Sequence, residues 1–151
     1  MFKFKNIGTF EVAHNIPYCA AQAKFKNGYA AVYDEAEKQA SLPSADTAKG
    51  NLAIVYNVID KPELKNPDDY TIEIGEFPRL IALNSINGHV VVMNTDAITT
   101  AYNTLAVGDT LVAGTDGKWA KGAVTGYKQY LKITALVAYN GNGIEAVVVN
   151  A

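Results

Sequence analysis

Apolar runs recur along the whole chain, and residues typical of turns separate them. β-branched and aromatic side chains fill these runs, and several alternate with a period of two, which is the pattern of strands with one buried face. Gly, Asn, Asp and Pro stand between them and indicate turns. The runs that predict strands are residues 9–12, 28–33, 38–42, 51–59, 70–74, 80–83, 89–93, 131–139 and 144–149.

The strongest local signal is the segment 105–121, LAVGDTLVAGTDGKWAK. A predicted strand at 110–113 ends at the turn Gly114–Gly117, and residues 118–120 begin the return strand. Asp-Gly between two apolar runs favours a β-hairpin, because hairpin turns need positive φ angles and glycine adopts them at no steric cost. We therefore predict a hairpin here.

Segments that predict helices are few. Residues 13–26 include a cluster of alanines but also Pro17, and residues 34–39 suffice for a single turn. Residues 96–105 begin with Asp96, a favourable N-cap, but are rich in threonine. The sequence therefore predicts an all-β fold, an antiparallel β-barrel or β-sandwich with at most one short helix.

An offset of 80 residues aligns several positions in the two halves of the chain. Gly28, Val32, Lys38 and Ala40 align in this way with Gly108, Val112, Lys118 and Ala120. Two interpretations stay open: two similar β units at about 9–80 and 81–151, or a periodicity that all-β chains share by composition. We expect a β domain over 19–151, preceded by an N-terminal arm or first strand over 1–18.

Composition narrows the range of partners. Hydrophobic residues make up 49% of the chain, enough for a core, while charged residues make up only 19%. The net charge of −2, without a basic cluster, disfavours nucleic acid as a partner. No run approaches the roughly 20 apolar residues of a membrane-spanning helix, and the N-terminus does not have the pattern of a signal peptide. We expect synthesis in the cytoplasm and no membrane partner.

The reactive residue types do not form a recognisable motif. His14, His89 and Cys19 have no spacing that would bring a nucleophile to a base, and a lone cysteine rules out an internal disulfide. Residues 60–69 carry four carboxylates that could hold Ca²⁺, but two lysines oppose them. Contact among Glu73, Glu76 and Glu145 stays open as a pair for glycoside chemistry. We expect a protein that is not an enzyme, with no catalytic residues, cofactor or metal.

Four features of the second half resemble a known family. They are Gly108-Asp109 before a short apolar strand, the turn and strand Gly117–Lys121, Gly126-Tyr127 leading into residues 130–138, and a terminal strand at 143–150. Together they resemble the small decoration proteins, also called head-stabilising or cement proteins, of tailed bacteriophages. The resemblance covers about a third of the chain.

This resemblance implies a non-enzymatic virion protein. Members of the family bind the outside of the capsid and stabilise it by bridging capsomers. The implied partners are the major capsid protein and further copies of the chain, as a homo-trimer or another homo-oligomer. One molecule that contacts several capsid subunits gains affinity from multivalency. The implied location is the capsid surface of the virion, after synthesis in the host cytoplasm.

Aromatic and apolar residues supply the candidate partner interface. In the N-terminal segment they are Phe2, Phe4, Ile7, Phe10 and Ile16, although this segment could instead start the domain's own sheet. In the second half they are Trp119, Tyr127 and Tyr130. Two alternative functions stay open: a phage tail, baseplate or fibre component, and a carbohydrate-binding β module whose stacking platform is formed by the latter three residues.

Overall fold

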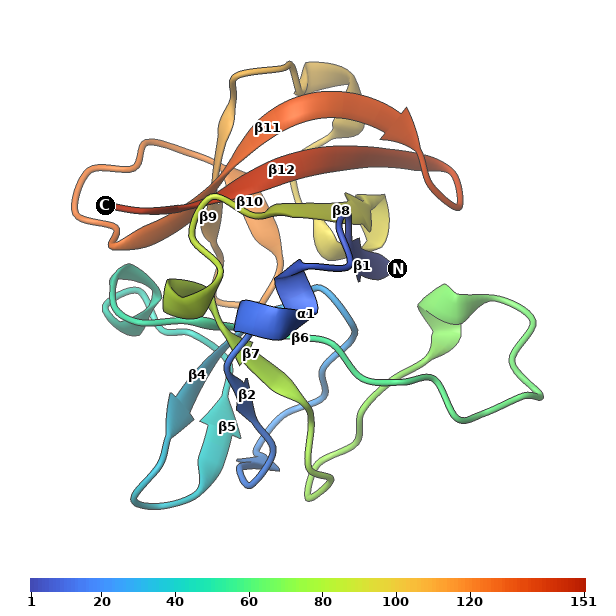
Figure 1. Ribbon diagram of the computed structural model, residues 1–151, viewed down its shortest axis with the longest axis vertical. Coiled ribbons are helices and arrows are strands. Elements are labelled where there is room, and N and C mark those ends of the chain that lie inside the picture. The colour runs from blue at the N-terminus through green and yellow to red at the C-terminus, as the bar shows by residue number, and fades with distance from the viewer.

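Two six-stranded sheets pack face to face in the computed structural model, which describes residues 1–151 (Figure 1). In spatial order, sheet A contains β1 (Phe2–Phe4), β8 (Val90–Asn94), β12 (Asn142–Asn150), β11 (Gln129–Ala138), β9 (Thr110–Ala113) and β10 (Trp119–Lys121). Sheet B contains β2 (Asn15–Ile16), β7 (Leu80–Ala82), β6 (Ala53–Val55), β4 (Ala30–Asp34), β5 (Gln39–Ser41) and β3 (Ala20–Ala21). Neighbouring strands are antiparallel except β3 and β5.

Helical structure is limited to one short helix, α1 (Thr9–Val12), and to single 3₁₀ turns. These turns are η1 (Thr47–Lys49), η2 (Pro67–Asp69), η3 (Leu83–Ser85), η4 (Thr95–Ala97) and η5 (Tyr102–Thr104). The predicted all-β fold with at most one short helix is confirmed, and its two layers form a sandwich.

The main core lies between the sheets. Ile54 and Ile81 of sheet B meet Leu111, Leu131 and Ile144 of sheet A there, and all five are buried. Along β11 and β12 buried residues alternate with more exposed ones, as expected for strands with one face on a core and one face in solvent.

A second core lies on the other face of sheet B. Val55 of β6 and Leu80 of β7 point to this side, and Phe25, Tyr70 and Ile72 from the connections cover them. The strands β6 and β7 are therefore buried on both faces, which explains why they contain continuous apolar runs in the sequence.

Two of the predicted strands are wrong. Residues 9–12 form α1, because the backbone amides of Phe10 and Glu11 bond to carbonyls three residues earlier, and no neighbouring strand pairs with the segment. Residues 70–74 form no strand, and only an isolated bridge joins Ile72 to Phe25. The alternation of 70–74 arises because the segment crosses the second core, where Ile72 is buried and Glu73 is exposed.

The two halves of the chain share a strand order. With the edge strands β1 and β3 set aside, the order in sheet B is β2-β7-β6-β4-β5, and in sheet A it is β8-β12-β11-β9-β10. When these five strands are numbered in chain order within each half, both sheets have the spatial order first, fifth, fourth, second, third. All of these strand pairs are antiparallel. The parallel pairing of β3 with β5 also has a counterpart, a parallel bridge from Ile98 to Trp119. This equivalence supports the interpretation as two similar units.

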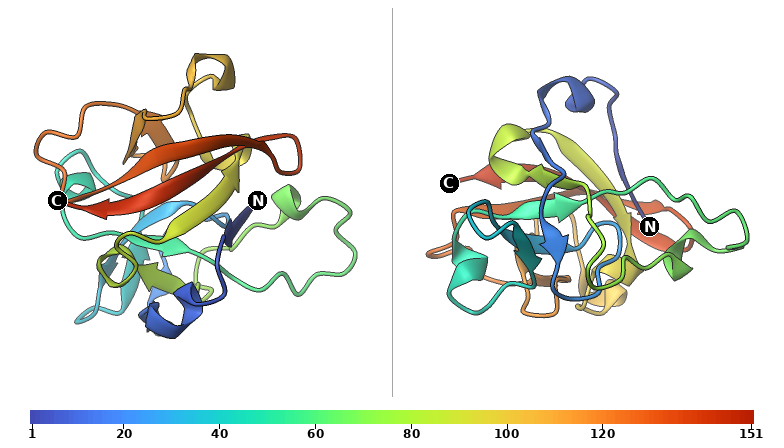
Figure 2. Two further views of the ribbon diagram at one scale, coloured as in Figure 1. Left: turned by 45° about the horizontal axis from the view of Figure 1, so that its top comes forward. Right: turned by 90° about the horizontal axis from the view of Figure 1, so that it is seen from below.

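The N-terminal segment belongs to both sheets. β1 forms the edge of sheet A, where Phe2 pairs with Met93 and Phe4 with Val91, and β2 pairs with β7 in sheet B. Between them, α1 and its flanking turns pass from one sheet to the other (Figure 2).

Candidate functional site

A cavity of about 500 Å³ opens at the end of the sandwich that holds the N-terminus. The long connection between β6 and β7, residues 56–79, forms one of its walls and extends away from the sheets on that side (Figure 2). Its apolar lining consists chiefly of Phe2, Phe10, Tyr56, Val58, Ile59, Tyr70 and Tyr139. The charged groups at the cavity belong to Met1, Lys26, Asp68, Arg79 and Asp96.

Aromatic packing fixes the inner wall of the cavity. The ring of Tyr56 lies edge-on to Phe2 and Phe4, with centroids 5.1 and 5.2 Å apart, and Phe4 contacts Phe10 of α1 at 5.0 Å. Such edge-to-face pairs stabilise by about 0.5–1.5 kcal/mol beyond the area that they bury. The cluster holds β1, α1 and the start of the 56–79 connection together.

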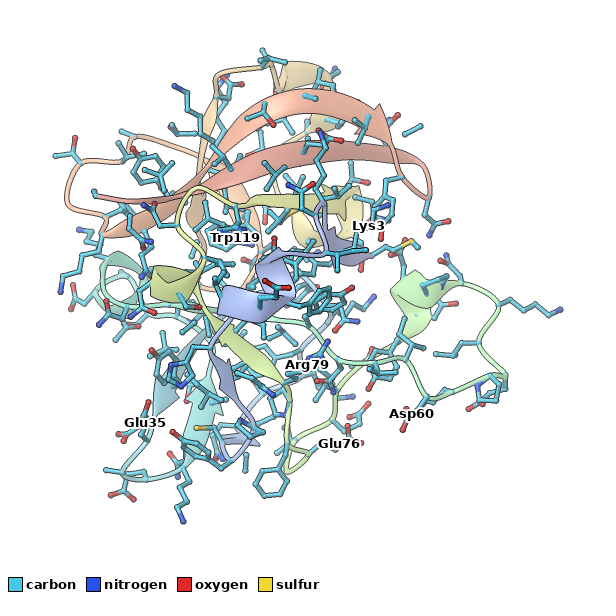
Figure 3. The ribbon with its side chains drawn as sticks, viewed as in Figure 1. Lys3, Glu35, Asp60, Glu76, Arg79 and Trp119 are labelled. Carbon is cyan, nitrogen blue, oxygen red and sulfur yellow. The ribbon has the colours of Figure 1, made fainter.

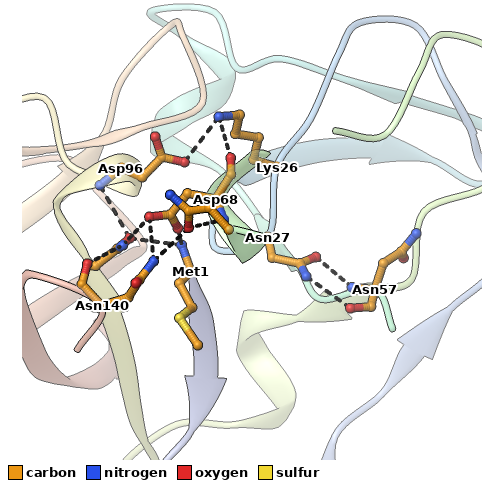
Figure 4. Close-up of polar contacts among 9 residues, drawn as sticks. Met1, Lys26, Asn27, Asn57, Asp68, Asp96 and Asn140 are labelled. Carbon is orange, nitrogen blue, oxygen red and sulfur yellow. Dashed lines mark hydrogen bonds and ion pairs between the residues drawn. The ribbon is translucent and has the colours of Figure 1, made fainter. Parts of the chain in front are cut away.

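Asp68 joins three distant segments at the cavity. Its carboxylate accepts hydrogen bonds from the amine of Met1, from Nδ2 of Asn94 at 2.7 Å and from Nδ2 of Asn140 at 3.0 Å (Figure 4). Burial raises the pKa of the Asp68 carboxyl, but these hydrogen bonds and the charge of the amine outweigh burial and hold it below its usual value. The 56–79 connection is thereby attached to sheet A.

Two further polar contacts fix the rim. Lys26 forms an ion pair with Asp96 at 3.4 Å and donates to the backbone carbonyl of Asp68 at 2.6 Å. Asn27 and Asn57 exchange two hydrogen bonds, because Nδ2 of Asn27 donates to the carbonyl of Asn57 at 2.9 Å and the amide of Asn57 donates to Oδ1 of Asn27 at 2.7 Å (Figure 4).

Arg79, which immediately precedes β7, is the one arginine of the chain. Its Nε donates to the carbonyl of Tyr56 at 2.6 Å, and its guanidinium carbon lies 5.1 Å from the centroid of the Tyr56 ring. No carboxylate lies within ion-pair distance of the guanidinium. Figure 3 places Arg79 between α1 and the 56–79 connection.

Four of the predicted partner residues lie in the core instead of on the surface. Phe2, Phe4, Ile16 and Trp119 are at most 6% exposed, because β1 and β2 are strands of the two sheets and Trp119 fills the space between them (Figure 3). The indole Nε1 of Trp119 donates to the carbonyl of Gly28 at 2.9 Å.

The remaining predicted partner residues have some surface. Ile7 is 87% exposed and Phe10 49% exposed, while Tyr127 and Tyr130 are half-buried. The stacking platform predicted for a carbohydrate-binding module consisted of Trp119, Tyr127 and Tyr130. Trp119 cannot stack on a sugar, because its ring is fully buried.

The reactive residue types named from the sequence do not converge on one site. Cys19 is buried in the second core, and burial raises the pKa of its thiol, whereas Nδ1 of His89 lies 2.9 Å from the hydroxyl of Thr9. Of the three carboxylates considered for glycoside chemistry, Glu73 and Glu76 are neighbours, because the backbone amide of Glu73 donates to Oε2 of Glu76 at 3.3 Å. Glu73 pairs with Lys24, and Glu145 pairs with Lys5 on sheet A. The structure contains no group of three His, Cys, Asp or Glu side chains arranged to hold a metal ion.

A second candidate surface is the face of sheet A that points away from sheet B, called here the outer face. Its centre is apolar: Val147 pairs with Val90 on one side and with Lys132 on the other, and Val149 pairs with Tyr130. Lys3, Lys132 and Glu145 add charges to it, and Lys132 also faces Thr110. The three valines are half-buried, with no other segment packed over them as over sheet B.

Sequence reasoning missed the cavity because its walls come from segments far apart in the chain. Residues 61–69 are rich in charged residues and contain two prolines, a composition typical of an exposed loop, yet the Asp68 side chain within this stretch is only 17% exposed. One signal was available: a single arginine in a chain with twelve lysines marks a position where a planar guanidinium is needed.

The chain matches no protein-family model, no curated protein and no solved structure. None of its helices has the length and apolar character needed to cross a membrane.

Proposed function

We propose that this chain is a non-enzymatic virion protein that binds the outside of a phage capsid and stabilises it by bridging capsomers. The observation that carries the proposal is the outer face of sheet A, a continuous β surface with an apolar centre and charges beside it. The phage-like features at 108–150 lie in the strands that build this same sheet.

The contrast between the two sheets supports a docking role for this face. The equivalent face of sheet B is covered by the chain's own residues, among them Phe25, Tyr70 and Ile72. The connection that supplies Tyr70 and Ile72 spans residues 56–79, whereas its counterpart between β11 and β12 is the short turn 139–141. Apolar surface rimmed by charged residues is typical of protein interfaces.

In this proposal the partner is the major capsid protein, and further copies of the chain assemble as a trimer or another homo-oligomer. The protein is made in the host cytoplasm and ends on the virion surface. Each contact is small, but a molecule that contacts several capsomers gains from a high effective concentration. A tail, baseplate or fibre component would use the same face on a different lattice.

The test measures cosedimentation of purified protein with expanded heads and, separately, with head-free tails of the encoding phage. Val147→Glu places a charge at the apolar centre of the outer face, and Val12→Glu makes the same change on exposed α1. We expect wild type and Val12→Glu to bind heads, and Val147→Glu to bind at least about tenfold more weakly.

Three results would count against the proposal. Binding to tails but not to heads would assign the protein to the tail, and equal binding of Val147→Glu and wild type would exclude the outer face. A gene located away from phage structural genes, rather than beside that of the major capsid protein, would exclude the capsid role.

A further inference from the structure

The cavity beside the N-terminus has the size and lining of a small-molecule site. Its volume of about 500 Å³ falls within the roughly 300–1,000 Å³ typical of ligand pockets. Three of the ten large hydrophobic residues that the chain exposes line this one cavity: Val58 at 72%, Phe10 at 49% and Ile59 at 39%. Their concentration around one opening indicates that an apolar group enters there.

The charges around the cavity leave one positive group without a partner. Asp68 is paired with the amine of Met1, and Asp96 is paired with Lys26. Arg79 has no carboxylate partner, so the lining carries one net positive charge. The charge balance therefore favours a monoanion, and the two carboxylates in the wall disfavour a more highly charged anion such as phosphate.

The guanidinium of Arg79 is held in a fixed orientation. Its Nε donates a hydrogen bond to the carbonyl of Tyr56, and the guanidinium lies over the Tyr56 ring. The backbone amide of Arg79 donates to Oδ1 of Asn57. The two terminal nitrogens of Arg79 donate to no acceptor in the protein. A guanidinium fork with two free nitrogens and a fixed position suits bidentate recognition of a carboxylate.

We propose that this cavity binds a small carboxylic acid with an apolar body. The carboxylate pairs with the terminal nitrogens of Arg79, and the apolar body packs among Phe10, Tyr56, Val58 and Ile59. This inference does not depend on the capsid proposal, because it concerns a different end of the sandwich.

The experiment titrates 3-phenylpropionate into the full chain at neutral pH and follows backbone amide NMR shifts. The uncharged 3-phenylpropanol serves as the matched probe. We expect the acid to shift the amides of Val58, Ile59 and Arg79 and to bind about tenfold more tightly than the alcohol, because a charge-assisted hydrogen bond is lost with the alcohol. Arg79→Gln should remove this difference.

Lys65→Gln is the control, since it removes the same charge from an exposed position of the same connection outside the lining. It should leave both affinities within about twofold of wild type. Val58→Glu covers the case in which Arg79→Gln does not fold, because Val58 is exposed, and it should weaken the acid at least about tenfold.

The proposal is overturned if acid and alcohol bind equally, or if no amide around the cavity shifts at millimolar acid. It is equally overturned if Val58→Glu binds the acid as wild type does.

Discussion

Asp68 binds Met1, Asn94 and Asn140 from three different parts of the chain, and its ionisation couples the stability of the fold to pH. Hydrogen bonds that favour the carboxylate hold its native pKa below the unfolded value of about 3.8. Its contribution to stability is therefore fully present above that value and is lost as the pH falls through the lower native pKa.

Asp68→Asn removes this contribution. In the untagged chain we expect it to lower the free energy of unfolding at pH 7 by about 1–3 kcal/mol, and the difference from wild type should vanish in strong acid. Urea denaturation at several pH values measures this. Asp60→Asn, at an exposed position of the same connection, should change little. A constant difference between Asp68→Asn and wild type from pH 7 to pH 2 would contradict the argument.

Phe2, Phe4 and Trp119 were predicted to contact a partner, but the structure buries all three in the core. Phe2 and Phe4 flank Lys3, so the sequence places both rings on one face of a strand, but it does not say whether that face meets a partner or the chain's own core. The pairing of β1 with β8 places both rings in the chain's own core. For Trp119 the deciding contact, a hydrogen bond to Gly28, joins positions 91 residues apart and leaves no local signal.

At the scale of elements, the β9–β10 hairpin was predictable because its turn chemistry is local. The turn ends at Gly117, whose φ is +81°, and a Cβ there would lie 3.0 Å from Cδ2 of Leu42 and 3.2 Å from the carbonyl oxygen of Ala30. The carbonyl of Gly117 also accepts a hydrogen bond from the amide of Ala30, so the turn is packed against sheet B.

Gly117→Ala should therefore cost about 2–4 kcal/mol, from backbone strain and the close contacts together. Gly88→Ala is the matched control, because Gly88 has a φ of +79° and open space around its missing Cβ, and it should cost about 1 kcal/mol. Urea denaturation compares the two. Equal losses would mean that the turn does not pack against sheet B as described.

Elements held by distant contacts were harder to predict. Residues 9–12 and 70–74 have strand-like patterns, yet no strand pairs with residues 9–12, and residues 70–74 pair with a neighbouring segment only at the isolated Ile72–Phe25 bridge. The period of the hydrophobic pattern indicates which side chains are buried, but not whether their backbone pairs in a sheet. Ile72, for example, is buried in the second core although it lies outside any strand.

At the scale of the whole molecule, the strand order links the two halves more clearly than the sequence does. The 80-residue offset could not separate repetition from shared composition, whereas the common order and the parallel bridge at Ile98 are specific to topology. The two halves differ in what covers the outer side of their sheets. Residues 56–79 supply part of the cover of sheet B and one wall of the cavity, whereas the short 139–141 turn leaves the outer face of sheet A open.

Maleimide labelling of free and head-bound protein tests most directly whether the outer face of sheet A docks on a capsid. Lys132→Cys puts a thiol on that face and Lys65→Cys puts one on the 56–79 connection, while the native Cys19 is fully buried. On heads, the thiol of Lys132→Cys should react at least about tenfold more slowly than in free protein, with Lys65→Cys nearly unchanged. Equal labelling of Lys132→Cys in both states, with binding intact, would contradict the account.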